Sequence, residues 1–219
     1  MDIFELVGPI MVGPSSSHTA GAARIGLVGR KLLNEEPVKA EIFLHGSFAA
    51  TYKGHGTDKA LIAGIMGMSA DDERIPRSLE LACQRGLEYS VSCVELRNAH
   101  PNSVLLKLTG QSGGRIEMTA ASVGGGRIEV RNIGGMELSF SAEHPTLIIK
   151  NEDQPGSVAD VSRVLAELKI NIGTFQVNRS SRGGKAIMII ECDEPIAPST
   201  VERIAAMPCI LRAVCVNPE

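Results

Sequence analysis

The sequence predicts an α+β fold in two domains, the first spanning residues 1–142 and the second residues 143–219. Three features support this prediction. Apolar residues recur at helical spacing in residues 18–33, and segments of alternating polarity dominate residues 88–133. Beyond residue 143 the predicted order is strand, helix, strand, strand, helix, strand. We therefore expect a mixed α/β domain followed by a smaller domain built on one sheet.

The first domain is expected to open with a helix over residues 18–33. Three glycines, Gly21, Gly26 and Gly29, lie inside this helix, and each costs about 1 kcal/mol relative to alanine. That cost indicates close approach by another backbone or by a ligand. The next predicted elements are a strand over 38–46, a short helix and then a glycine-bracketed loop over 47–56, a helix over 57–68 capped by Thr57 or Asp58, and a short helix over 77–86.

Period-two alternation and glycine-rich turns then predict an antiparallel meander. Its strands cover residues 88–96, 102–110, 114–122 and 126–133. The second domain is predicted as strand 146–151, helix 155–169, strands 170–180 and 184–193, helix 197–207 and strand 210–217. This βαββαβ order is that of a ferredoxin-like unit, with Pro155 in the first turn of its first helix.

The composition is that of an ordinary globular protein, with 43% hydrophobic and 21% charged residues. Aromatic residues make up 3%, Trp is absent and the net charge is −3, which argues against nucleic-acid binding. No apolar stretch approaches the roughly 20 residues that a membrane span requires. The start, "MDIFELVGPI", carries acids where a signal peptide needs basic residues, so we expect a cytoplasmic protein without a membrane partner.

The cysteines argue against a cofactor held by this chain. They number five and include no C-x-x-C pair, which predicts neither a disulfide framework nor a zinc or iron–sulfur site. A metal site built from His18, His45 and His55 also lacks a carboxylate or thiol at a reliable ligand spacing. The expected metal content of this chain is therefore none.

The stretch "GPSSSHTAG", residues 13–21, is a candidate anion site. Unpaired N–H groups and partial positive charge at a helix start attract a carboxylate. Ser15, Ser16, Ser17 and Thr19 add hydroxyl donors, and His18 can donate or accept one more hydrogen bond. The simpler alternative is that one serine caps the helix while the others face water.

A second stretch, "KGHGTD", places His55 between two glycines, where a loop would expose the imidazole. Histidine exchanges protons near neutral pH, so His55 is a candidate acid or base, with Lys53 and Asp58 near enough to tune it. His45 at a strand end ranks second. His100 and Asn102 in "AHPNS" are expected at the same surface, although a histidine on a loop is more often only solvated.

The segment "NEDQPGSVADVSRVLAELKINI", residues 151–172, resembles the ACT domain, a small module that binds amino acids. The resemblance rests on the loop Asp153–Gly156 and on the pair Asn171–Ile172. It implies a possible amino-acid effector. The implied contacts are Asn151, Asp153, Gln154, Gly156, Asn171 and Ile172. An unpaired edge strand in such a sheet also predicts self-association of this domain.

"VGPSSSHTAGAARIG" and "HGSFAATYKGHGTDKA" resemble the beta chain of two-chain, iron–sulfur-dependent L-serine dehydratases. The resemblance implies an allosteric-substrate-binding-type N-terminal domain, and conversion of L-serine to pyruvate and ammonia together with an alpha chain. It also implies that the alpha chain carries the [4Fe-4S] cluster and that this chain alone is inactive.

The resemblance strengthens these residues as site candidates. We expect His55 and His18 to be catalytic, with His55 the better candidate for the base, because a glycine-flanked loop can enter a cleft of the partner chain. The expected substrate-binding residues are Ser15, Ser16, Ser17, Thr19, His45, Lys53 and Asn102. Two alternatives stay open: a purely regulatory amino-acid-binding subunit without catalytic groups, and a stand-alone sensor of a small anion.

Overall fold

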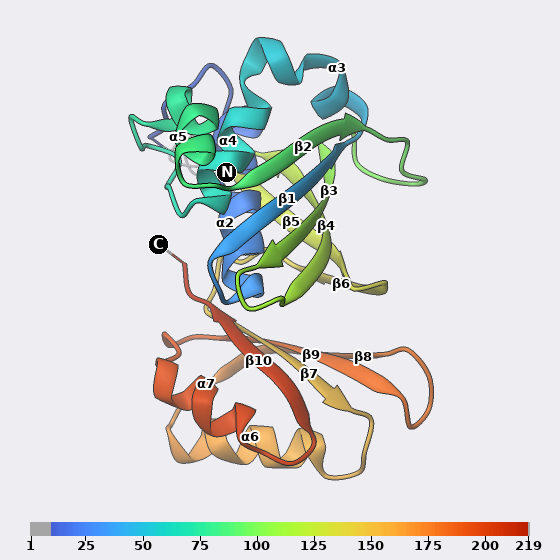
Figure 1. The fold of residues 1–219 in the computed structure, drawn as a ribbon. Coiled ribbons are helices and arrows are strands. Elements are labelled where there is room, and N and C mark those ends of the chain that lie inside the picture. The colour runs from blue at the N-terminus through green and yellow to red at the C-terminus, as the bar shows by residue number, and fades with distance from the viewer. Residues whose placement is uncertain (1–9, 219) are drawn as a thin grey trace. The chain divides into compact units, whose positions relative to one another are not determined.

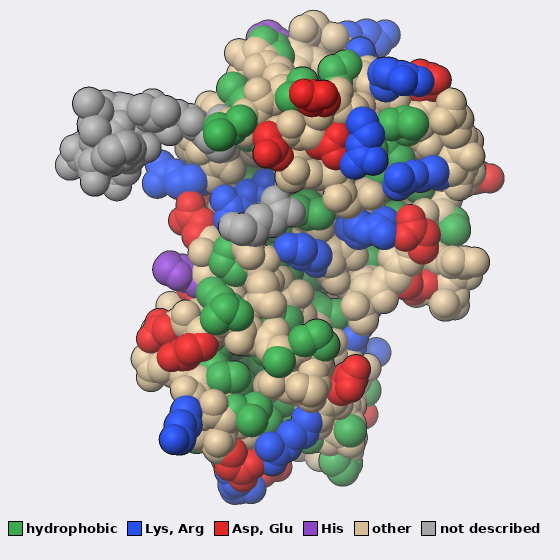
Figure 2. Space-filling model, turned by 90° about the vertical axis from the view of Figure 1, so that its left-hand side faces the viewer, with side chains coloured by type: hydrophobic (Ala, Val, Ile, Leu, Met, Phe, Trp, Pro, Cys, Tyr) green, Lys and Arg blue, Asp and Glu red, His purple; other side chains and the backbone are tan. Residues whose placement is uncertain are grey.

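The structure, a computed structural model, describes residues 10–218 and contains two compact units that divide between Gly135 and Met136 (Figure 1). Of the ten residues on which the expectation about a signal peptide rests, the first nine lie outside this described part. None of the helices within residues 10–218 has the length and apolar character that a membrane crossing requires. On the face drawn in Figure 2, basic and acidic side chains are interspersed.

The larger sheet has the strand order β2-β1-β3-β4-β5-β6. Its strands are β1 (Pro37–Leu44), β2 (Glu88–Cys93), β3 (Ser103–Gly110), β4 (Arg115–Gly124), β5 (Arg127–Ile133) and β6 (Met136–Phe140). The helices of the first unit are η1 (Ser16–Gly21), α2 (Ala22–Leu33), α3 (Gly46–His55), α4 (Thr57–Ile65), η2 (Ile75–Arg77) and α5 (Ser78–Gln84). The boundary expected at 142/143 follows the end of β6 and stays a prediction, since the units divide just before that strand.

The strand β2 corrects the predicted meander. β1, β3, β4 and β5 pair antiparallel in this order, as expected for neighbouring hairpins, but β2 pairs with β1 in parallel, with Leu44 opposite Cys93. Three helices, α3, α4 and α5, lie between β1 and β2 in the chain, and such a crossover returns a strand in the same direction. Alternating polarity identified the strand but carried no information on its direction.

The glycines of the first long helix are explained by packing. A Cβ at Gly26 would overlap the backbone of Leu61, and one at Gly64 would overlap the backbone of Ala23, so α2 and α4 touch through bare glycines. Gly29 lies against the Leu106 side chain of β3. Close approach by neighbouring elements, and not by a ligand, therefore accounts for the glycines of α2.

Two predicted boundaries around the candidate motifs were wrong. The α-helix expected over residues 18–33 begins only at Ala22, and a wider π-helical turn, η1, for which Ser15 is the N-cap, takes the place of its first four residues. The glycine-bracketed loop does not form, because α3 continues through Gly54 and ends at His55. Gly56, with φ of 68°, makes the left-handed turn into α4 in place of a Thr57 or Asp58 cap.

The second unit confirms the predicted ferredoxin-like order. It contains β7 (Thr146–Glu152), α6 (Ser157–Glu167), β8 (Ile172–Arg179), β9 (Lys185–Cys192), α7 (Pro198–Ala205) and β10 (Ile210–Val216). The sheet order is β10-β7-β9-β8, and both helices pack on one face of it (Figure 1). The apolar side chains of Leu147, Ile149, Met188 and Ile190 form the core beneath them. Pro155 precedes α6 and does not lie in its first turn.

Candidate active site

His18 lies in η1 with hydroxyl groups around both ring nitrogens. Its Nδ1 is 3.0 Å from Ser17 Oγ and 3.4 Å from Ser15 Oγ, and its Nε2 is 3.4 Å from Ser47 Oγ. Ser15 Oγ also accepts a hydrogen bond from the backbone N–H of His18 at 3.3 Å. Because hydroxyls donate or accept, this setting suits either neutral tautomer of the imidazole. We call Ser15, Ser17, His18, Ser47 and His55 the His18 cluster.

The helix α3 supplies the other half of this cluster. Phe48 is fully buried and its ring meets that of His18 edge-on, with centroids 5.0 Å apart. At the opposite end of α3, the His55 ring lies 5.0 Å from the His18 ring at an angle of 38°. Two motifs that are separate in sequence therefore form one site, in which a buried imidazole faces an exposed one.

The tautomer of His55 follows from a hydrogen bond within α3. His55 Nδ1 is 3.4 Å from the backbone carbonyl of Thr51, which lies one helical turn earlier and can only accept. Nδ1 therefore carries the proton when the ring is neutral, and Nε2 keeps its lone pair. Because His55 is exposed, that lone pair is available to a group outside this chain.

The environment of His18 favours its neutral form. Burial of the ring lowers the pKa of His18, the nearby His55 lowers it further, and hydrogen bonding of the ring to the backbone carbonyl of Ser47 opposes both effects. The imidazole is only 9% exposed, so a proton on it would be poorly solvated. The protein thus favours the uncharged form of His18.

This lowered pKa predicts a pH dependence of folding stability. Below pH of about 6.5, an unfolded His18 takes up a proton that the folded ring resists, so the free energy of unfolding should fall as pH falls through this range. Urea unfolding followed by circular dichroism at about pH 7.5 and 5.5 measures the loss. His18→Gln should remove part of it, whereas an equal loss in that variant would contradict the assignment.

The first turn of the site retains open donors. The N–H groups of Ser16 and Ser17 donate to no acceptor within residues 10–218, and both side chains are partly exposed. Thr19 differs, because it is only 2% exposed and its hydroxyl packs against Gly13. The structure therefore brings Ser15, Ser16 and Ser17 beside His18 but points Thr19 away from them.

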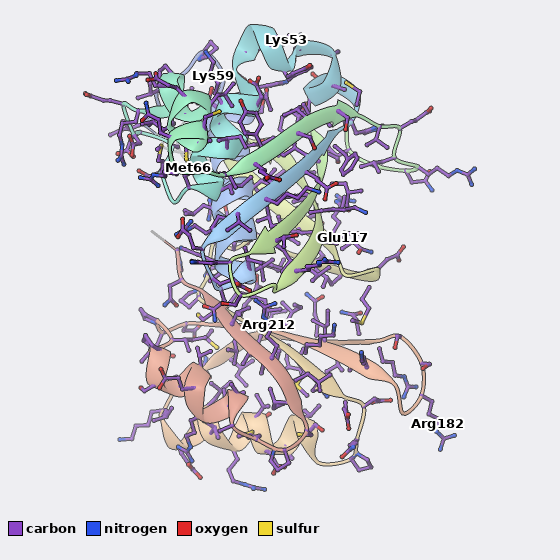
Figure 3. All side chains as sticks on the ribbon, in the orientation of Figure 1. Lys53, Lys59, Met66, Glu117, Arg182 and Arg212 are labelled. Atoms are coloured by element: carbon purple, nitrogen blue, oxygen red, sulfur yellow. The ribbon has the colours of Figure 1, made fainter. Side chains whose placement is uncertain are left out.

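The remaining expected substrate residues lie at varied places. Lys53 is exposed on α3, at the same end of the first unit as Lys59 of α4 (Figure 3). His45 is the N-cap residue of α3, and its Nδ1 accepts from the backbone N–H of Leu96 at 3.1 Å. Asn102 uses its backbone, donating to His100 Nδ1 and accepting from the N–H of Ser122. Among residues 10–218, no side-chain hydrogen bond, ion pair or ring contact joins His45, Lys53 or Asn102 to the His18 cluster.

In the second unit, part of the expected effector set does lie together. Asn151 is 2% exposed, and its Oδ1 has no partner in the described part of the chain. Asp153 accepts from the N–H of Gly183 at 3.0 Å and pairs with Arg179 at 3.3 Å. Gly156 takes φ of 97° as the N-cap of α6, so the loop from Asn151 to Gly156 is a tight connection between β7 and α6.

The pair Asn171–Ile172 is far from that loop. Asn151 lies opposite Ala186, and Ile172 lies opposite Cys192, at the two ends of β9. These ends are about 20 Å apart at the usual rise per residue of a strand. Asn171 instead donates to Asp193 and Glu194 at its own end. One small ligand therefore cannot touch both sets within one chain.

The cysteines of this chain do not fit an iron–sulfur cluster, which needs several thiolates together. Cys83 and Cys93 are exposed in the first unit, and the other three lie in the second. Burial raises the pKa of the Cys192 thiol to about 11, which disfavours the thiolate that binds iron. Within residues 10–218, no three His, Cys, Asp or Glu side chains gather as a metal site requires.

Sequence reasoning missed Ser47 and Phe48. They are the two residues after Gly46 in "HGSF", at the point where β1 ends and α3 begins. A polar residue at such a strand-to-helix turn is a recognisable site signal, but its partner His18 is 29 positions away in the chain. Only the packing of η1 against α3 brings them together.

Fold and site together define a class of protein with two parts. An α/β unit carries a site of two imidazoles and several serine hydroxyls, and a ferredoxin-like unit follows it in the sequence. Residues 1–132 match the family model of the serine dehydratase beta chain, and residues 145–209 match that of the ACT domain. The chain is 40% identical to the probable L-serine dehydratase beta chain of Bacillus subtilis over 210 residues, covering 96% of this chain and 95% of that protein.

Two further relatives extend the comparison. The L-serine dehydratase beta chain of Peptoniphilus asaccharolyticus is 40% identical over 197 residues, 90% of this chain and 89% of that one. The D-3-phosphoglycerate dehydrogenase of Bacillus subtilis is 25% identical over 191 residues, 87% of this chain but 36% of that protein. The chain therefore belongs to the serine dehydratase beta-chain family and ends in an ACT domain.

Proposed function

We propose that this chain is the beta subunit of an L-serine dehydratase and that it completes the active site of an alpha chain. The observation that carries the proposal is the His18 cluster, in which an exposed imidazole and a buried neutral one lie 5.0 Å apart beside serine hydroxyls. The matches to family and relatives support the same activity. The complex would work in the cytoplasm.

The reaction is a β-elimination, in which a base removes the α-proton of L-serine while the hydroxyl leaves. The open N–H groups of Ser16 and Ser17 and the hydroxyl of Ser15 suit the substrate carboxylate. Lys53 and the side chain of Asn102 would complete binding at the rim. Thr19 receives no support for this role, because its hydroxyl is buried against Gly13.

His55 is proposed as the base and His18 as its neighbour. With Nδ1–H held by the Thr51 carbonyl, Nε2 of His55 can accept the α-proton. A neutral His18 beside it avoids charge repulsion once His55 is protonated. The basis differs from the sequence expectation, since His55 projects from a helix end and not from a loop.

The [4Fe-4S] cluster is proposed to belong to the alpha chain, because the donor set of this chain does not fit it. The test is anaerobic reconstitution with iron and sulfide of the alpha chain, this chain, and both together. We expect pyruvate formation only from the mixture and no cluster absorbance from this chain alone. Full activity of the alpha chain alone would favour a purely regulatory subunit, and a stoichiometric cluster on this chain would overturn the assignment.

The ACT domain is proposed to mediate self-association, with a possible amino-acid effector at the loop Asn151–Gly156. Within residues 10–218, β8 is an edge strand paired with β9, and Val177 on it is 44% exposed. The buried Oδ1 of Asn151, which has no partner within residues 10–218, supports a polar ligand at this loop.

Removal of residues 144–219 should therefore lower the oligomeric state. An open edge strand pairs with a second copy, so light scattering of the full chain should report a larger species than that of residues 1–143. A charge on the edge provides the matched variant: Val177→Lys should dissociate the full chain without unfolding it. An unchanged oligomer after truncation would show that association uses the first unit.

A further inference from the structure

The segment between β2 and β3, residues 94–102, touches the start of α3. Figure 1 shows it leaving the end of β2 beside the N-terminal end of that helix. Its first residue, Val94, donates to the carbonyl of Leu44 at 2.8 Å, and Asn102 at its end accepts from the N–H of Ser122 at 3.0 Å. Backbone hydrogen bonds thus hold both ends of the segment to the sheet. The residues between them are held by a contact outside the sheet.

His45 supplies that attachment. The backbone N–H of Leu96 can only donate, so its 3.1 Å hydrogen bond to His45 Nδ1 requires an unprotonated Nδ1. The Val94 carbonyl lies 3.3 Å from the same nitrogen, but an unprotonated Nδ1 cannot donate a hydrogen bond to it. Cys93 and Glu95 line a cavity together with His45. Nδ1 is therefore engaged inside the chain and not open to a substrate.

The segment in turn provides the acceptor for the first turn of α3. The N–H of Ser47 donates to the carbonyl of Pro101 at 2.8 Å, and that of Phe48 to the same oxygen at 3.4 Å. Helix starts leave such donors unpaired, so this one carbonyl satisfies two of them. Gly46 permits the approach, because it takes φ of 57° and any Cβ there would lie 2.6 Å from Pro101 O.

Ser47 and Phe48, in the first turn of α3, both contact the His18 ring. We propose that His45 is a positioning residue, whose Nδ1 holds segment 94–102 so that Pro101 fixes the start of α3 against His18. This role replaces the substrate-binding role expected from the sequence. The expected effect of His45 on turnover rests on the proposed function. The expected effect of His45 on the conformation of segment 94–102 and α3 concerns this chain alone.

Two amide replacements of His45 separate positioning from substrate contact. Asparagine places an acceptor near the position of Nδ1, whereas glutamine reaches toward the position of Nε2. The first measurement is amide-proton exchange by NMR on the full chain. We expect His45→Ala and His45→Gln to speed exchange of the Leu96, Ser47 and Phe48 amides about tenfold, the equivalent of one hydrogen bond, and His45→Asn to preserve the wild-type rates.

The second measurement is turnover with the alpha chain. His45→Ala and His45→Gln should lower kcat about tenfold to a hundredfold with little change in KM, as misplacement of a site does, and His45→Asn should restore it. Glu95→Gln, exposed on the same segment, is the matched control and should leave both measurements unchanged.

The outcomes separate the two proposals. Rescue by glutamine and a raised KM for His45→Asn would show that His45 binds substrate through Nε2 and overturn the positioning role. Unchanged exchange in His45→Ala would overturn it as well. Altered exchange together with an inactive wild-type mixture would leave the positioning role standing and contradict the proposed enzyme activity instead.

Discussion

Replacing His55 with alanine should lower kcat of the reconstituted enzyme by about 10²–10⁴-fold, the usual loss when a general base is removed. The Nε2 lone pair of His55 has no substitute at that position, because the neighbouring His18 ring is buried and held by hydroxyls on both nitrogens. The serine hydroxyls and open amides remain, so serine should still bind. Initial rates of pyruvate formation with saturating alpha chain measure the effect.

A comparison variant and a control variant accompany this experiment. His18→Ala should raise KM more than it lowers kcat, since it removes the group that the serine hydroxyls surround. Lys59→Gln removes a charge at the same end of the unit without touching the His18 cluster and should change neither constant (Figure 3). Near-normal turnover of His55→Ala would place the base on His18 or on the alpha chain.

Replacing Gly64 with alanine should destabilise the first unit by about 3 kcal/mol or more, at the upper end for overpacked cores. A Cβ at this position overlaps backbone atoms of Ala23 and Leu27, and backbone cannot rotate away as a side chain can. α2 and α4 would have to separate, and η1 with His18 directly precedes α2. The midpoint of urea unfolding, followed by circular dichroism because the chain lacks Trp, reports the loss.

Gly54→Ala is the matched control for this change. Gly54 lies inside α3, and a Cβ there meets no atom within 4 Å. Alanine should therefore stabilise the helix by roughly 1 kcal/mol through its higher propensity. If Gly64→Ala proves as stable as Gly54→Ala, the close contact between α2 and α4 is not the reason for glycine at residue 64.

The features that local pattern determines were predictable. The ferredoxin-like order after residue 143 and the antiparallel run from β3 to β5 follow from periodicity and turn residues. The sequence motifs likewise identify Ser15, Ser17, His18 and His55 as chemistry-bearing residues. Their grouping into one site is consistent with that expectation, although their roles stay proposals.

The predictions were wrong where tertiary packing determines the direction of a strand, the end of a helix or the distance between two segments. The parallel pairing of β2 depends on the three-helix crossover, which alternation cannot reveal. Glycines at 54 and 56 suggested a loop, yet helix hydrogen bonds continue through Gly54 and only Gly56 turns left-handed. Asn171 was expected to share an effector site with the loop at Asn151. The strand register places the two residues beside opposite ends of β9.

The most direct test of the account is hydrogen exchange of this chain with and without the alpha chain and L-serine. The account predicts that the alpha chain slows exchange in residues 15–19 and 51–57, which carry the His18 cluster, and that L-serine slows residues 15–19 further. His55→Ala should keep the first effect. Protection confined to residues 146–216, with none in the two motifs, would contradict a shared active site and leave a subunit that acts only through its ACT domain.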